Sequence, residues 1–152
     1  MKNIDYIVSE LDQYIILCAK ADLKVSRSSI GWHIEHSLKV IHQIVETLEK
    51  SNPNEYKWRF NFWRIVVITF QKIPRGRGKA PEAVLPVGEI SMEILKQSMD
   101  KAKSSLKKIK NLDPNAHFAH PYFGLLNLKP TQIFLAIHTN HHLKIIKDIA
   151  KN

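Results

Sequence analysis

Two histidines four positions apart, His138 and His142, are the residues whose type and spacing most directly indicate chemistry. Residues four apart lie on one face of an α-helix, one turn above the other. A helical wheel over residues 133–149 places both at the centre of an apolar arc, with His141 at its edge. Burying two imidazoles without partners for their nitrogens is costly, and a shared metal ion would satisfy one nitrogen of each ring. The spacing therefore predicts a metal site whose third ligand comes from elsewhere in the chain.

The third ligand is expected on the helix that begins near Ser28 or Ser29, both of which are suitable N-caps. The wheel of this helix places His33 inside the apolar arc and His36 just outside its edge, which by itself favours His33. His42 points away from both. From the residues alone, His33 and His36 therefore both remain candidates for the third ligand.

Length and composition limit the classes of protein to consider. A chain of 152 residues with 44% hydrophobic and 24% charged residues predicts one soluble domain spanning residues 1–152. The single cysteine, Cys18, lies in an apolar repeat and excludes both an internal disulfide and a cysteine-rich zinc site. The N-terminus lacks the apolar run of a secretory signal, and no stretch is long enough to span a bilayer. We therefore expect a cytoplasmic protein without a membrane partner.

The net charge of +9 raises the question of nucleic acid or another anionic partner. Most of the clustered lysines between residues 101 and 110 alternate with apolar residues at helical spacing, which is typical of a solvated helix face. No nucleic-acid-binding motif accompanies them, so nucleic acid is the less favoured partner. The basic loop at residues 75–81 is either an exposed connection or an anion-binding lid near a pocket, but its glycines do not have phosphate-loop spacing.

Helical periodicity covers almost the whole chain. The spacing of apolar residues predicts helices over residues 3–21, from 28 or 29 to about 50, over 88–111, and from about 127 or 131 to 149. The segment 56–73 is dense in bulky apolar residues and predicts a buried additional helix, although its β-branched run also permits a strand. The predicted fold class is therefore all-α, an antiparallel four-helix bundle with one additional buried helix and no required strand.

Three short motifs resemble those of the DinB-like (YfiT-like) superfamily of metal-dependent proteins. The stretch from Ser29 to Leu38 is similar to the start of that family's second helix, with matches at Ile30, Ile34 and His36. The stretch 138–143 resembles the family's HxxxH on the last helix. The stretch 120–124 resembles an HP-x-FG pattern in one uncharacterised branch. Two features depart from the pattern: the tryptophan follows the Ser-Ile instead of preceding it, and Leu-Lys follows the last histidine where many members have Gly-Gln.

The resemblance implies an up-down-down-up bundle and a metal triad of His36, His138 and His142. We weigh this motif above the wheel and take His36 as the third ligand. The implied cofactor is a divalent metal ion, with zinc or nickel favoured, although all-imidazole ligation also accommodates iron or manganese. Characterised relatives include thiol transferases, so the resemblance implies a small-molecule substrate, with a low-molecular-weight thiol as one candidate.

Three neutral imidazoles leave the ion its full charge and an open position, which suits catalysis better than a closed structural site. A metal-dependent thiol transferase or isomerase is the leading hypothesis, and hydrolysis by metal-bound water is second. The alternatives are a non-catalytic metal-binding or stress-response module, in which His33, His120 or a carboxylate closes the site, and a basic nucleic-acid-binding bundle. Glu35 and Glu89 are conceivable general bases, and we assign neither. Apolar bundle helices also make a homodimer conceivable.

Overall fold

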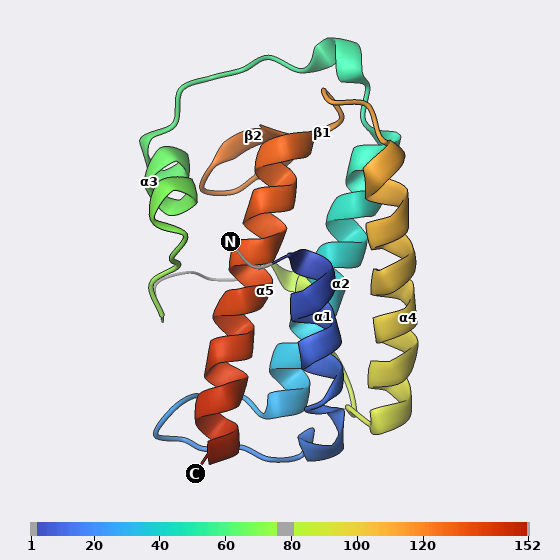
Figure 1. Ribbon diagram of the computed structural model, residues 1–152. Coiled ribbons are helices and arrows are strands. Elements are labelled where there is room, and N and C mark those ends of the chain that lie inside the picture. Colours follow the sequence, from blue (N-terminus) through green and yellow to red (C-terminus); the bar gives the residue numbers. More distant parts are fainter. Residues whose placement is uncertain (1–2, 76–80, 152) are drawn as a thin grey trace.

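The computed structural model describes residues 3–75 and 81–151 and consists mainly of helices (Figure 1). Four helices form the bundle: α1 (Ile4–Asp12), α2 (Ile30–Lys50), α4 (Met92–Lys108) and α5 (Leu128–Lys151). A shorter helix, α3 (Phe62–Phe70), and a two-stranded antiparallel sheet of β1 (His117–His120) and β2 (Gly124–Asn127) complete the main elements. Short 3-10 turns lie at Ile15–Leu17, Pro53–Glu55, Glu82–Val84 and Ile109–Asn111.

The bundle has the predicted up-down-down-up arrangement. In Figure 1, α1 and α5 run in one direction, and α2 and α4 run in the other. Because α2 and α4 are parallel, the chain must return along the length of the bundle between them, and residues 51–91 form this crossover with α3 on its path. The all-α fold class is therefore confirmed.

The core follows from the apolar spacing of the four long helices. Each of three helices begins at a side-chain cap, since Asn3, Ser29 and Ser91 accept hydrogen bonds from backbone N–H groups of the first turn. The largest side chains that are almost fully buried come from all four helices and from β2. They are Ile7, Leu11, Ile30, Ile34, Leu38, Ile41, Leu48, Leu95, Met99, Leu126, Leu135 and Leu143.

The start of α2 packs unusually closely on the preceding chain. The Gly31 N–H donates a 2.8 Å hydrogen bond to the Cys18 carbonyl, and a Cβ at Gly31 would lie 2.9 Å from that oxygen. Only glycine permits this approach without displacement of the backbone. The contact fixes the position of the first turns of α2, which carry His33 and His36.

The lysines of α4 form a solvated face, as expected. Lys101, Lys103, Lys107 and Lys108 are all exposed. Two of them pair with carboxylates of neighbouring helices, Lys103 with Asp12 at 3.4 Å and Lys108 with Glu49 at 3.2 Å. No helix in the described part of the chain is both long and apolar enough to cross a membrane.

Three expectations about individual elements are wrong. The first helix ends at Asp12 and continues only as a 3-10 turn, and a β-hairpin lies where no strand was required. The additional helix is not buried: of α3, only Arg64 and Val67 are buried. Arg64 is buried because it donates to the carbonyls of Leu125 and Arg59 and so ties α3 to the hairpin. Most of the bulky apolar residues of this segment face outward instead.

Candidate metal centre

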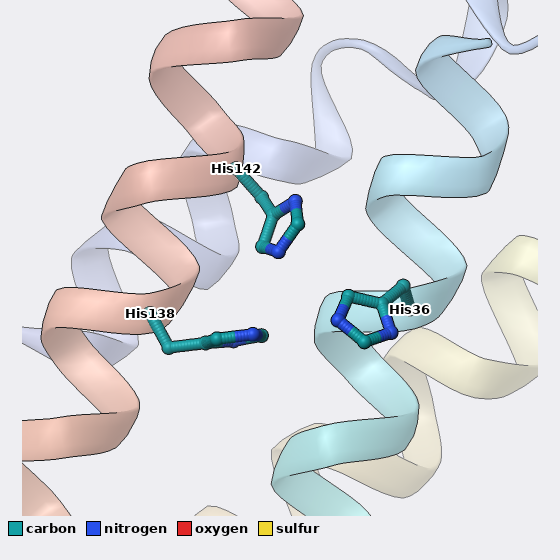
Figure 2. A group of neighbouring side chains, drawn as sticks. All are labelled: His36, His138 and His142. Atoms are coloured by element: carbon teal, nitrogen blue, oxygen red, sulfur yellow. The ribbon is translucent and has the colours of Figure 1, made fainter. Parts of the chain in front are cut away.

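Three imidazoles from two antiparallel helices converge in the middle of the bundle. His36 comes from α2, and His138 and His142 come from successive turns of α5 (Figure 2). One possible ligand nitrogen from each ring lies within 4.8 Å of the others. The ring centroids are 4.7 Å apart for His138 and His142, and 4.8 Å apart for His36 and His142. This spacing is compatible with a single ion bound by all three rings.

Hydrogen bonds at the far side of two rings determine which nitrogen is available. His36 Nδ1 lies 2.9 Å from the Val84 carbonyl oxygen, which can only accept, so Nδ1 carries the proton and Nε2 has a free lone pair. His142 Nδ1 lies 2.9 Å from His33 Nδ1, and when it donates its proton to that nitrogen its own Nε2 is available in the same way. Ligating histidines characteristically donate their other N–H to such an acceptor. Both rings therefore have the environment of metal ligands.

The third ring, His138, supplies an independent test of this fit. It forms no hydrogen bond to any described residue, and its Nδ1 atom is buried without a partner. Buried polar atoms are almost always paired, so an orphan needs a physical reason. A ring that binds a metal has one of its two nitrogens satisfied by the ion. The residues present therefore fit a bound divalent ion better than they fit a site that lacks one.

Burial keeps these rings neutral. Desolvation is the main cause that lowers the pKa of His138 and His142 well below the ordinary value, and neighbouring imidazoles lower both further. Burial also lowers the pKa of His36, although its bond to the Val84 carbonyl opposes the shift. A metal ligand must be the neutral imidazole. The site therefore presents three rings in their metal-binding form near neutral pH.

The structure places the two candidates for the third ligand in different surroundings. His36 joins the cluster, whereas both nitrogens of His33 are engaged elsewhere, Nδ1 with His142 and Nε2 with the Ser26 hydroxyl at 2.9 Å. The wheel favoured His33 because it counts only the apolar residues of its own helix. His36 is nevertheless 3% exposed, because the crossover turn at Glu82–Val84 covers that side of α2. Such a tertiary contact leaves no trace in the periodicity of α2.

The remaining chemical candidates lie outside the cluster. The Nδ1 atom of His120 accepts two backbone N–H groups of the hairpin turn, and the ring stacks on Phe123 at 4.2 Å. With Gly124 at a φ of 67°, these contacts make the HP-x-FG stretch a turn motif. Glu35 is buried but does not belong to the cluster, and Glu89 is exposed. No carboxylate of the described chain joins the three imidazoles.

Trp32 is a site residue whose position the sequence predicted only in outline. Its ring stacks on His36 with centroids 5.0 Å apart and an interplanar angle of 16°. It forms a half-buried wall beside the triad. Trp58 and Trp63 lie in the segment that was expected to be buried, and this was wrong, because both are 64% exposed. The signal for Trp32 was its position one helical turn before His36.

A groove of about 330 Å³ lies between residues 71–75 and α5. Its floor includes Ile73 and Ile137, and its charged lining residues are all cationic: Lys72, Arg75 and Lys144. His141 also lines the groove, and its ring contacts that of His142 edge-on at 5.2 Å. The groove therefore adjoins the metal-ligand face of α5. The predicted basic loop is described only at Arg75 and Pro81, so most of it lies outside the described residues.

Comparison with known proteins agrees with this architecture. A family model described as the DinB superfamily matches residues 16–146, which includes α2, α5 and the three histidines. Neither the curated proteins nor the solved structures contain a match.

The buried histidines make the stability of the metal-free protein depend on pH. Burial lowers the pKa of His33 to about 4, and electrostatic interactions with His36, His141 and Arg75 lower it further. Below an unfolded-state pKa of about 6.5 the unfolded chain binds protons that the folded chain does not, so stability falls on acidification. Between about pH 7.5 and 5, His33 alone should cost on the order of 2 kcal/mol of unfolding free energy. Urea unfolding of the metal-free protein at both pH values measures this.

Two substitutions control that measurement. His33→Gln should reduce the loss of stability on acidification, because one buried titrating ring is gone. His117→Gln, which changes a half-buried histidine outside the cluster, should leave the loss unchanged. Equal unfolding free energies for the wild type at the two pH values would contradict the expectation.

Proposed function

The chain belongs to the DinB superfamily, and from that premise we propose that it is a metal-dependent enzyme whose divalent ion is held by His36, His138 and His142. The observation that carries the proposal is the convergence of three neutral imidazoles on one point, with the outward nitrogens of two of them already engaged. A non-catalytic site would need a further protein ligand to close it. The engaged nitrogens of His33 and the hairpin role of His120 favour the open site.

The ligand set indicates what the ion would contribute. Three neutral imidazoles leave a divalent ion its full charge, and zinc or nickel is the metal that we favour. When bound, such an ion lowers the pKa of a coordinated water to about 7 and stabilises a thiolate in the same way. The protein's own part is to hold the three rings neutral, to aim the Nε2 atoms of His36 and His142 through the Val84 and His33 contacts, and to exclude water on the Trp32 side.

The reaction that we favour is thiol transfer or isomerisation on a small molecule. In the transfer, the sulfur of the thiol forms a bond to an electrophilic carbon of the second substrate, and the leaving group departs with the electron pair of the broken bond and takes up, through solvent, the proton that the thiol releases. Hydrolysis is the second candidate. Direct nucleic-acid binding is disfavoured, because lysines of α4 already pair with carboxylates of α1 and α2.

The groove beside α5 is proposed to hold the part of the substrate that does not bind the metal. Its apolar lining and three cations suit a small organic anion, and no carboxylate among the described residues lines it. Arg75 is partly neutralised by Asp148 at 2.7 Å. Lys72 and Lys144 are therefore the cations that would interact most strongly with a bound anion. His141, which lines the groove, also contacts the ring of His142.

A second copy of the chain is the proposed partner. The crossover exposes Trp58, Phe60, Phe62, Trp63 and Phe70, and we call these residues the aromatic face. Exposed aromatic patches of this kind mark interaction surfaces. Tryptophan and phenylalanine are enriched at the buried centres of protein interfaces, where burial of their rings stabilises the complex. An aromatic ring that stays in solvent contributes no such stabilisation. A symmetric dimer through α3 would bury these residues.

Removal of a single ligand should abolish metal binding. Tag-free wild type reconstituted with zinc or nickel should contain about one ion per chain, and His36→Ala or His138→Ala should contain less than about a tenth of that. Elemental analysis after gel filtration measures the content. His42→Ala is the matched control on α2 and should retain the ion. Wild type without metal after reconstitution with either ion would overturn the proposal.

Neutralising the groove should weaken anion binding without affecting the metal. Benzoate, titrated while the ring resonances of His141 are followed by NMR, should bind Lys144→Gln about three- to tenfold more weakly than wild type, and added salt should weaken binding to both. Lys101→Gln, an exposed lysine on α4, is the control and should bind as wild type does. Equal affinities for all three proteins would exclude the groove as the anion site.

A charge on the aromatic face should dissociate the dimer. Light scattering after gel filtration should give a dimeric mass for wild type at about 50 μM and a monomeric mass for Trp63→Lys, because an unpaired charge cannot be buried in the interface. Ile16→Lys changes a residue that is also exposed but lies away from α3, and it should remain dimeric. A monomeric wild type at that concentration would contradict the assignment.

A further inference from the structure

His33 links the candidate ligand His142 to the loop that precedes α2. Its Nδ1 lies 2.9 Å from His142 Nδ1, and its Nε2 lies 2.9 Å from the hydroxyl of Ser26. The ring is 4% exposed, so these two contacts are its principal polar partners. The Ser26 hydroxyl also accepts the backbone N–H of Ser28, which holds it in a local turn. The three side chains form a short hydrogen-bonded chain that ends at the metal centre.

A neutral imidazole has one N–H and one lone pair, so a proton at one end of this chain fixes every proton along it. In one arrangement His142 Nδ1–H donates to His33 Nδ1, and His33 Nε2–H donates to Ser26 Oγ. In the other, Ser26 O–H donates to His33 Nε2, and His33 Nδ1–H donates to His142 Nδ1. The second arrangement leaves the proton of His142 on Nε2. Only the first leaves that nitrogen free to bind an ion.

This ambiguity distinguishes His142 from His36. The partner of His36 is the Val84 carbonyl, which can only accept, so the tautomer of His36 is fixed before any metal arrives. The partner of His142 can either accept or donate. The tautomer of His142 is therefore set by His33 and, through it, by whether Ser26 accepts or donates.

We propose that His33 is a positioning residue. It accepts a hydrogen bond from Nδ1–H of His142 and donates its own Nε2–H to the Ser26 hydroxyl, and it thereby holds His142 with Nε2 unprotonated toward the metal. The inference rests on the proposed metal site and assigns His33 a role that is not ligation. Acceptors of this kind for ligating histidines are worth about 10- to 100-fold in metal affinity.

The test compares zinc dissociation constants, measured by competition with a chromophoric chelator, in variants that alter the Ser26–His33–His142 hydrogen-bonded chain at different points. His33→Phe keeps the ring volume but removes both nitrogens, and it should bind zinc about 10- to 100-fold more weakly than wild type. His33→Asn can place an amide oxygen near the former Nδ1 position and should recover most of that loss. Ser26→Ala removes only the distal partner and should have a smaller effect than His33→Phe.

The chain offers a matched control for this series. His42 also lies on α2 and also contacts a serine through one ring nitrogen, with Nδ1 2.9 Å from the Ser105 hydroxyl, but it has no contact with the triad. His42→Phe therefore removes a comparable His–Ser hydrogen bond from the same helix and should leave zinc affinity unchanged. Circular dichroism and unfolding midpoints establish that each variant is folded.

A spectroscopic measurement tests the tautomer directly. In wild type loaded with zinc, the ¹⁵N resonances of His142 should show a protonated Nδ1, with its proton hydrogen-bonded to His33. In folded His33→Phe that bond should be lost, with the Nδ1 proton in more rapid exchange with solvent.

Three results would overturn the inference. Zinc affinity in folded His33→Phe within about twofold of wild type would show that the metal site does not need the hydrogen bonds of His33. Loss of affinity in His42→Phe as large as that in His33→Phe would attribute the effect to helix stability. Wild type that binds neither zinc nor nickel would overturn the proposed function and, with it, the role of His33.

Discussion

The structure depends on one constraint: several imidazoles are buried together, and each must remain neutral and have its nitrogens satisfied. Unpaired buried nitrogens and buried imidazolium charges are both costly. The fold meets the constraint with a carbonyl for His36 and a second imidazole for His142, while a nitrogen of His138 has no protein partner. The site is thus incomplete as a hydrogen-bonding network. That incompleteness is the main physical reason to regard it as a metal centre instead of a polar packing defect.

The same constraint gives the long crossover a function. Two parallel helices, α2 and α4, need a connection that spans the bundle, and this chain uses residues 51–91 for it. The end of the crossover lies across α2, where Val84 supplies the carbonyl that fixes His36, and its middle forms the wall of the cationic groove. Topology and site chemistry are therefore coupled. A shorter connection could not supply both the acceptor and the groove.

Sequence reasoning succeeded where local spacing determines the outcome. The i, i+4 pair on α5, the caps of α2 and the apolar stripes are properties of single helices, and the bundle followed from them. It failed where a distant segment decides. The burial of His36 depends on Val84, and the exposure of α3 depends on its lack of a covering segment from elsewhere in the described chain. The motif resemblance selected His36 because it reflects a tertiary arrangement that a helical wheel omits.

The positive charge around the site favours the proposed small anionic substrate. A metal held by three neutral imidazoles keeps its full positive charge, and the described residues supply no carboxylate beside it. In a chain of net charge +9, with Lys72, Arg75 and Lys144 at the adjoining groove, that charge increases the local positive potential. A thiolate or carboxylate substrate would relieve it, and a neutral one would not. In the proposed site, neutral ligands would therefore make the ion more electrophilic and would also favour anionic substrates, so that one feature of the ligand set would serve both chemistry and recognition.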